Sequence, residues 1–167
     1  CAEKLQNAPG WAFRYSDLNF IVLGEIVQRI SHQSLADLVA SEVDGPLKMT
    51  NTGFVPAPEK RLRIAPTERV QGEILRGVVH DPTARRMGGV AGHAGLFTTA
   101  ADLARFARMM LNEGTLDGVR VFQSATVRLM TEVQTPARIE ARRGLGWDID
   151  SGYSRPRGKW FPIGSYG

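Results

Sequence analysis

A hydroxyl residue and a carboxylate stand directly before a strongly apolar stretch near the beginning of the chain, in the segment Tyr15-Ser16-Asp17. Ser16 or Asp17 can cap a helix, because its side-chain oxygen can accept a hydrogen bond from a free backbone N–H. The apolar residues that follow recur at spacings of three and four, which predicts an amphipathic helix. This apolar stripe consists of Leu18, Ile21, Val22, Ile26, Val27 and Ile30. A helix with such a stripe needs another part of the fold to cover it.

The composition is that of an ordinary globular protein. Of the 167 residues, 43% are hydrophobic and 23% are charged, which suits a single domain. The net charge of +4 comes from short basic clusters such as residues 60–63 and 155–159. No aromatic residues alternate with these clusters and no nucleic-acid motif accompanies them. We therefore expect solvated basic loops and no nucleic-acid partner.

Cysteine usage and apolar runs say little about the compartment. Cys1 is the single cysteine, so we expect no internal disulfide. No run approaches the roughly 18 apolar residues of a membrane span, and we expect none. No apolar core follows Cys1-Ala2-Glu3-Lys4, so the pattern of a signal peptide is missing from this chain.

Further elements follow from caps, breakers and periodicity. We expect a helix that starts at Ser34 and stops near Gly45-Pro46, where proline cannot continue it. Residues 50–90 show no strong periodicity and are expected to be irregular, as in a lid. Thr99 and Asp102 form a capping box that predicts a helix ending at Gly114. A helix over 124–132 and strands over 144–149 and 159–163 complete the prediction.

The segment around Tyr15 has the pattern Pro-Gly-x-x-Phe-x-Tyr-Ser-Asp-x-Asn-Phe-x-x-Leu-Gly. It resembles the second motif, Tyr-x-Asn, of the serine β-lactamase and penicillin-binding-protein superfamily, in particular its esterase and D-Ala-D-Ala-peptidase relatives. The resemblance implies that Tyr15 is the general base or its partner in proton transfer, that Ser16 contacts the substrate, and that Asp17 takes the place of the asparagine. Without the resemblance, Tyr15 is a packing residue and Ser16-Asp17 is only a helix cap.

Asp17 is a departure from that motif with chemical consequences. An ionised aspartate only accepts hydrogen bonds, whereas an asparagine also donates them. A donor for a substrate amide carbonyl is therefore missing, although a carboxylate can still pair with a lysine. Ester or peptide hydrolysis is accordingly a firmer expectation than β-lactam hydrolysis.

A glycine-rich stretch that ends in Gly92-His93-Ala94-Gly95 leads into the helix capped by Thr99. It resembles the Gly-Gly-Leu-x-Ser-Thr-Ala-x-Asp-Leu segment at the floor of the substrate cleft in the same superfamily. The resemblance implies that His93 lines the cleft and contacts the substrate. The alternative, equally open, is a structural histidine bonded to loop carbonyls. The three histidines, His32, His80 and His93, do not have the sequence spacing typical of metal ligands, and they have no cysteine partners. We therefore expect no metal site.

Two of the three superfamily motifs are missing from the chain. No serine is followed three residues later by a lysine, and no strand carries Lys/His-Thr/Ser-Gly. The resemblance thus implies an α+β, predominantly helical chain: the helical lobe of a β-lactamase-like fold over 1–143, with a long irregular segment near 50–95, and one or two C-terminal strands of the sheet lobe within 144–167.

The function implied by the resemblance is that of a serine hydrolase which cleaves an ester, a β-lactam or a peptide through an acyl-enzyme. It needs no cofactor, and it places the protein in the periplasm or outside the cell. This chain alone is not expected to be catalytically competent, and its uncovered apolar faces predict self-association or a missing partner segment. The alternative is a non-catalytic module that binds cell-wall material or another anionic polymer.

Overall fold

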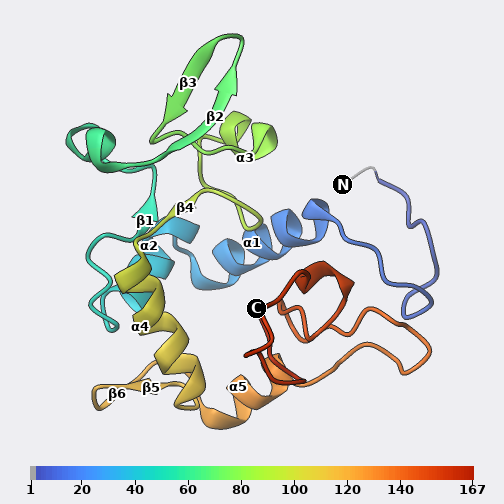
Figure 1. The fold of residues 1–167 in the computed structure, drawn as a ribbon. Helices are drawn as coiled ribbons and strands as arrows, with labels where there is room; N and C mark the ends of the chain where they lie inside the picture. Colours follow the sequence, from blue (N-terminus) through green and yellow to red (C-terminus); the bar gives the residue numbers. More distant parts are fainter. Residues whose placement is uncertain (1–2) are drawn as a thin grey trace. The chain divides into compact units, whose positions relative to one another are not determined.

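The computed structural model describes residues 3–167, so Cys1 and the disulfide expectation attached to it lie outside the described residues. Helices and short antiparallel strand pairs make it an α+β structure (Figure 1). The chain divides into two compact units. One consists of the residues up to Tyr15 together with Phe122–Gly167, and the other is Ser16–Val121. The boundary therefore falls inside the tyrosine motif, between Tyr15 and Ser16.

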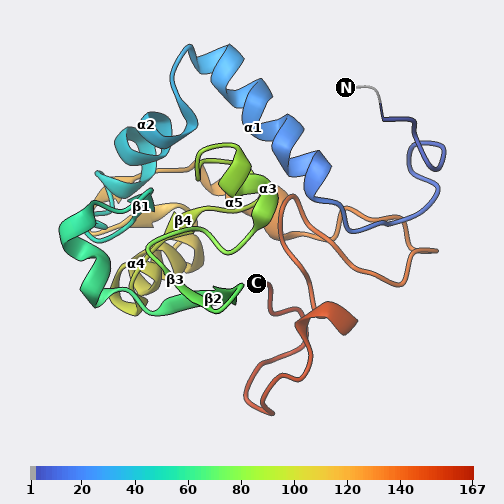
Figure 2. The same ribbon diagram turned by 90° about the horizontal axis from the view of Figure 1, so that it is seen from above.

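Helix α1, Asp17–Ser31, is the predicted apolar helix and leads into α2, Leu35–Val39 (Figure 2). The helix prediction is confirmed, and Ser16 does stand at the N-cap position, but the predicted capping hydrogen bond is not made. Ser16 is the N-cap residue with an extended backbone, and its side chain makes no capping hydrogen bond. Asp17, in the first turn, still places a negative charge at the positive end of the helix dipole. The helix ends at His32, whose backbone is left-handed with φ of 56°.

The apolar stripe of α1 is largely uncovered within the described residues. Only Gly24 of this helix is buried, whereas Val22, Ile26 and Ile30 are 41%, 43% and 76% exposed. Helix α1 packs against α2 and against the loop that contains Gly92. These contacts occupy the glycine side of the helix and leave the branched side chains open.

The segment after α2 contains more regular structure than the sequence predicts. A π-helical turn over Ala40–Asp44 ends as expected before Gly45-Pro46. Strand β1, Gly53–Phe54, pairs with β4, Leu96–Phe97. The stretch expected to be irregular contains a 3-10 helix over Pro58–Arg63 and helix α3, Pro82–Arg86. Between them lies a hairpin of β2, Pro66–Val70, and β3, Glu73–Arg76. Short strands with mostly exposed or half-buried side chains leave little alternation to detect, which is why the prediction was wrong.

Helix α4, Ala100–Leu111, starts at the predicted Thr99 cap and forms the Thr99 half of the predicted capping box. Thr99 accepts a hydrogen bond from the backbone N–H of Asp102. The Asp102 carboxylate in turn accepts from the backbone N–H of Asn51 at 2.8 Å and from the Thr52 hydroxyl at 2.9 Å, which fastens α4 to the segment before β1. The hairpin of β5, Thr115–Leu116, and β6, Val119–Arg120, follows the helix. The buried apolar residues of this region are Leu47, Met49, Met109, Met110 and Leu116.

The other unit contains α5, Ser124–Thr131, as predicted, and a 3-10 turn over Gly152–Ser154. The predicted strands over 144–149 and 159–163 are wrong. In the described part of this unit, single bridges join Arg143 to Asp148 and Ile149 to Tyr166, and no strand forms. Positive φ angles at Gly146 and Asp150 interrupt the extended backbone that a strand requires. Among the described residues, no helix has the length and hydropathy of a membrane span.

Candidate active site

Two glycines place the glycine-rich loop directly on α1. A Cβ atom at Gly92 would stand 2.1 Å from the carbonyl oxygen of Phe20, and one at Gly24 would stand 3.2 Å from the Cα of Gly92. The first distance leaves no room for a side chain at Gly92, and the second is a tight contact that a Cβ at Gly24 would meet only if its neighbours shifted slightly. The close approach brings the residue after Gly92, which is His93, to the beginning of α1.

His93 is held by a carboxylate. Its Nε2 lies 2.8 Å from Asp81 Oδ1, and its side chain is only 4% exposed. Asp81 is also the N-cap residue of α3, where Oδ1 accepts a hydrogen bond from the backbone N–H of Ala84 at 2.7 Å. The bond from Ala84, and then the bond with His93, hold the pKa of Asp81 below its ordinary value. The partner of His93 Nε2 is therefore a carboxylate and not a loop carbonyl, and both the structural and the substrate-contacting role of His93 stay predictions.

Asp17 completes this group. A carboxylate oxygen of Asp17, one of Asp81 and a ring nitrogen of His93 all lie within 4.8 Å of one another. The three residues, called here the Asp–Asp–His cluster, come from the start of α1, the start of α3 and the glycine-rich loop. A histidine and two carboxylates are donors that a divalent metal accepts, although His93 Nε2 already bonds Asp81. The other ring nitrogen, Nδ1, is buried and has no hydrogen-bond partner within residues 3–167.

Tyr15 belongs to the other unit, where its ring is exposed and stacked. The ring lies parallel to that of Tyr153, with centroids 6.2 Å apart and an interplanar angle of 18°. Tyr153 also meets the edge of Phe13 at 5.8 Å. The guanidinium of Arg143 lies 4.6 Å from the Tyr153 ring and 4.8 Å from the Phe13 ring, within cation–π distance of both. Tyr15 itself is 65% exposed.

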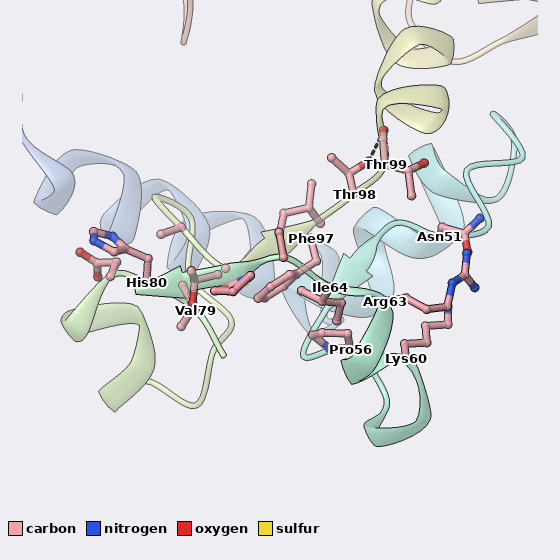
Figure 3. A pocket seen from close by; sticks show the side chains of 17 residues that line it. Asn51, Pro56, Lys60, Arg63, Ile64, Val79, His80, Phe97, Thr98 and Thr99 are labelled. Carbon is pink, nitrogen blue, oxygen red and sulfur yellow. Dashed lines mark hydrogen bonds between the residues drawn. The ribbon is translucent and has the colours of Figure 1, made fainter. Parts of the chain in front are cut away.

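A pocket of about 630 Å³ opens beside the cluster, within the unit Ser16–Val121 (Figure 3). Its volume falls in the range of roughly 300–1,000 Å³ that is typical of small-molecule sites. Asp81 lines the pocket and belongs to the Asp–Asp–His cluster, so pocket and cluster are contiguous. His93 is not among the lining residues, but its neighbours Ala94 and Gly95 are.

The sequence named Tyr15, Ser16, Asp17 and His93 as site residues. The structure brings Asp17 and His93 together and adds Asp81, which the sequence showed only as part of an isolated His-Asp pair. An Asp before a Pro is an N-cap signal, and it could have marked Asp81 as the start of α3. Nothing local signals that Tyr153 stacks on Tyr15, because these two residues are far apart in the chain.

Comparisons with known proteins identify the family. The model of the Beta-lactamase family matches residues 1–167. The chain belongs to this family. The resemblance found in the tyrosine motif is thereby confirmed, and it places the chain in the superfamily of serine β-lactamases and penicillin-binding proteins, whose members are serine hydrolases.

Relatives in the beta-lactamase family agree with this assignment. A protein of Escherichia coli (strain K12), provisionally named D-alanyl-D-alanine carboxypeptidase, is 35% identical over 163 residues, which cover 87% of this chain and 37% of that protein. The chain thus spans little more than a third of the length of the relative. A similarly named protein of Salmonella typhi is 33% identical over 167 residues.

Solved structures show the shared fold. A beta-lactamase from Mycobacterium bovis is 21% identical, with a TM-score of 0.66, and the likeness covers 98% of this chain and 51% of that one. A beta-lactamase/D-alanine carboxypeptidase from Pseudomonas syringae is 18% identical, with a TM-score of 0.65 over 88% of this chain and 38% of that one. Both support a beta-lactamase-like α+β fold for this chain.

Proposed function

We propose that this chain is the tyrosine-bearing part of a serine hydrolase that cleaves esters or peptides through an acyl-enzyme. The observation that carries the proposal is the position of Asp17: it stands two residues after Tyr15, inside the Asp–Asp–His cluster, at the edge of a pocket of substrate size. Family membership supports the reaction class. The provisional name of the Escherichia coli relative makes a peptide that ends in D-alanine one candidate substrate.

In the proposed reaction, a serine oxygen attacks the carbonyl carbon of the substrate, and the serine proton passes to the oxygen of Tyr15, which acts as the phenolate. The tetrahedral intermediate collapses, the alcohol or amine leaves with that proton, and the acyl group stays on the serine. Water then attacks the acyl-enzyme and gives a proton to Tyr15. As the acid leaves, this proton passes to the serine oxygen, which restores the serine and the phenolate. The nucleophile comes from outside these 167 residues, because none of the eight serines of the chain has a lysine three residues later.

Asp17 orients the reacting groups in this proposal. Its carboxylate can hold a lysine ammonium by charge and hydrogen bonding, while Asp81 and His93 line its other side. Ser16 and His93 are proposed to contact the substrate, Ser16 through its hydroxyl and His93 at the rim of the glycine-rich loop. We also propose that residues 1–143 belong to a mainly helical lobe and that 144–167 lead into the sheet lobe. The uncovered stripe of α1 would then face a further segment or a second copy of the chain.

The test uses the full-length protein, meaning the longest natural protein that contains these residues, with a p-nitrophenyl ester as substrate. We expect Tyr15→Phe to lower kcat by about 10²- to 10⁴-fold, the usual loss when a general base is removed. Tyr153→Phe is the matched control, because it keeps the stacked ring and removes a hydroxyl with no assigned role. Unchanged turnover in Tyr15→Phe would refute the proposed role.

A second experiment distinguishes the proposed hydrolase from a module that only binds cell-wall material. The full-length protein is incubated with a fluorophosphonate probe, and its intact mass is measured. One covalent adduct supports a serine hydrolase. No adduct, together with retention on cell-wall material that weakens as salt rises, would favour the binding module instead. The chain of 167 residues alone is expected to form no adduct.

A further inference from the structure

The pocket beside the Asp–Asp–His cluster has two chemically different ends. Figure 3 shows His80 at one end, and Asn51, Lys60 and Arg63 together at the other. Asp81, the lining residue shared with the cluster, is the neighbour of His80 in the chain. The side chains between the two ends are mostly apolar. They include Pro56, Ile64, Val79 and Phe97 (Figure 3).

The two cations have no counter-charge in the part of the chain that the structure describes. Neither Lys60 nor Arg63 takes part in a side-chain hydrogen bond or ion pair with another residue of 3–167. Other arginines of the chain behave differently. For example, Arg105 pairs with Asp117 and Arg85 with Glu68. Two unpaired cations at one end of a pocket attract an anion, and an arginine can bind a carboxylate through two parallel hydrogen bonds.

We propose that this pocket binds a substrate whose carboxylate lies at Lys60 and Arg63, separated by an apolar segment from the bond that is cleaved near Asp17. The inference rests on the proposed function, because it identifies the cluster end of the pocket with the reacting bond. The apolar walls at Ile64, Val79 and Phe97 bury the segment between the two groups. The substrate class is therefore an acyl or peptidyl compound with an anionic group remote from the scissile carbonyl.

The specificity test compares two esters that differ only in the far end of the acyl chain: mono-p-nitrophenyl adipate, which carries a carboxylate, and p-nitrophenyl hexanoate, which does not. We expect the full-length protein to prefer the adipate in kcat/KM. Lys60→Ala combined with Arg63→Ala should lower kcat/KM for the adipate by about 3- to 30-fold and leave the hexanoate unchanged. Arg61→Ala is the matched control, since Arg61 lies on the same 3-10 helix and does not line the pocket.

A measurement of ligand affinity tests the pocket assignment independently of whether the protein is a hydrolase. The probes are the phenyl ketone of adipic acid, which has no bond to hydrolyse, and uncharged hexanophenone. We expect tighter binding of the acid, lost in the double variant and reduced by added salt. Selective binding without ester turnover would overturn the proposed reaction and support the pocket assignment. Equal binding of both probes, or an unchanged Kd in the double variant, would overturn the pocket assignment.

Discussion

His93 Nε2 lies 2.8 Å from Asp81 Oδ1, and this contact joins the glycine-rich loop to the N-cap of α3. The pair is part of the three-residue Asp–Asp–His cluster, since Asp17 at the start of α1 lies near both side chains. Three segments of the chain therefore meet at one group of polar atoms. Their meeting depends on the glycine contact between the loop and α1, and the first prediction concerns that contact.

Gly92→Ala should destabilise the protein by about 1–3 kcal/mol, the usual cost of forcing an extra group into a packed site. The added Cβ would stand 2.1 Å from the Phe20 carbonyl oxygen, so loop or helix has to move. Thermal and denaturant unfolding measure the loss. Gly158→Ala is the control, because no heavy atom lies within 4 Å of its added Cβ. Equal stability of the two variants would show that the loop does not rest on α1.

Asp81→Asn should change how stability depends on acidity. The pKa of Asp81 lies below the ordinary 3.8 in the folded protein, so its carboxylate favours folding above that value and the contribution is lost as pH falls through the folded pKa. We expect the unfolding midpoint of the wild type to fall more steeply than that of Asp81→Asn as pH decreases from about 5 to about 2. Parallel pH profiles for the two proteins would contradict the prediction.

Arg143→Met should destabilise the protein by about 2–4 kcal/mol. Arg143 Nε lies 3.2 Å from Asp148 Oδ1, and the Asp148 side chain is only 9% exposed. Burial alone would raise the pKa of Asp148, but hydrogen bonds from the neighbouring serines and the charge of Arg143 hold it below its ordinary value. The substitution leaves this carboxylate buried without its cation and removes the contact with the Tyr153 ring.

The control for that experiment is Arg138→Met. Arg138 is exposed, its guanidinium lies 6.0 Å from the Trp11 ring, and its Nη2 donates a hydrogen bond to the Gly10 carbonyl oxygen, so its removal leaves no buried charge without a partner. Chemical denaturation of both variants measures the difference in unfolding free energy. If Arg143→Met were no more destabilising than Arg138→Met, the ion pair with Asp148 would contribute little to stability.

Asp17→Asn should broaden the chemistry of the full-length protein. The amide donates as well as accepts hydrogen bonds, so it can hold a substrate amide carbonyl that a carboxylate repels. We expect the rate of acylation by a β-lactam, relative to ester turnover, to rise by about tenfold, which corresponds to one hydrogen bond of about 1.4 kcal/mol. Intact-mass spectrometry over time gives the acylation rate. Asp37→Asn, an exposed carboxylate on α2, is the control, and a ratio unchanged in both variants would contradict the assigned role of Asp17.

The sequence alone determined the helices that local interactions specify. Three signals act within a few residues and can be read directly from neighbouring positions: the apolar spacing of α1, the Thr99 cap of α4 and the breaker Gly45-Pro46. The family was recognisable for a similar reason, because the tyrosine motif is contiguous. The same local rules were wrong for residues 144–149, where positive φ angles at Gly146 and Asp150 bend the chain out of a strand.

Only the tertiary structure decided which polar groups face one another. No local pattern connects the segments that meet in the Asp–Asp–His cluster, where Asp81 pairs with His93 and Asp17 lies near both. The same holds for the stacking of Tyr153 on Tyr15. It also holds for Lys60 and Arg63, which line one end of a pocket. Such contacts follow from how packed elements meet in space, and the sequence records them only through glycines such as Gly92, whose missing side chain lets two backbones approach.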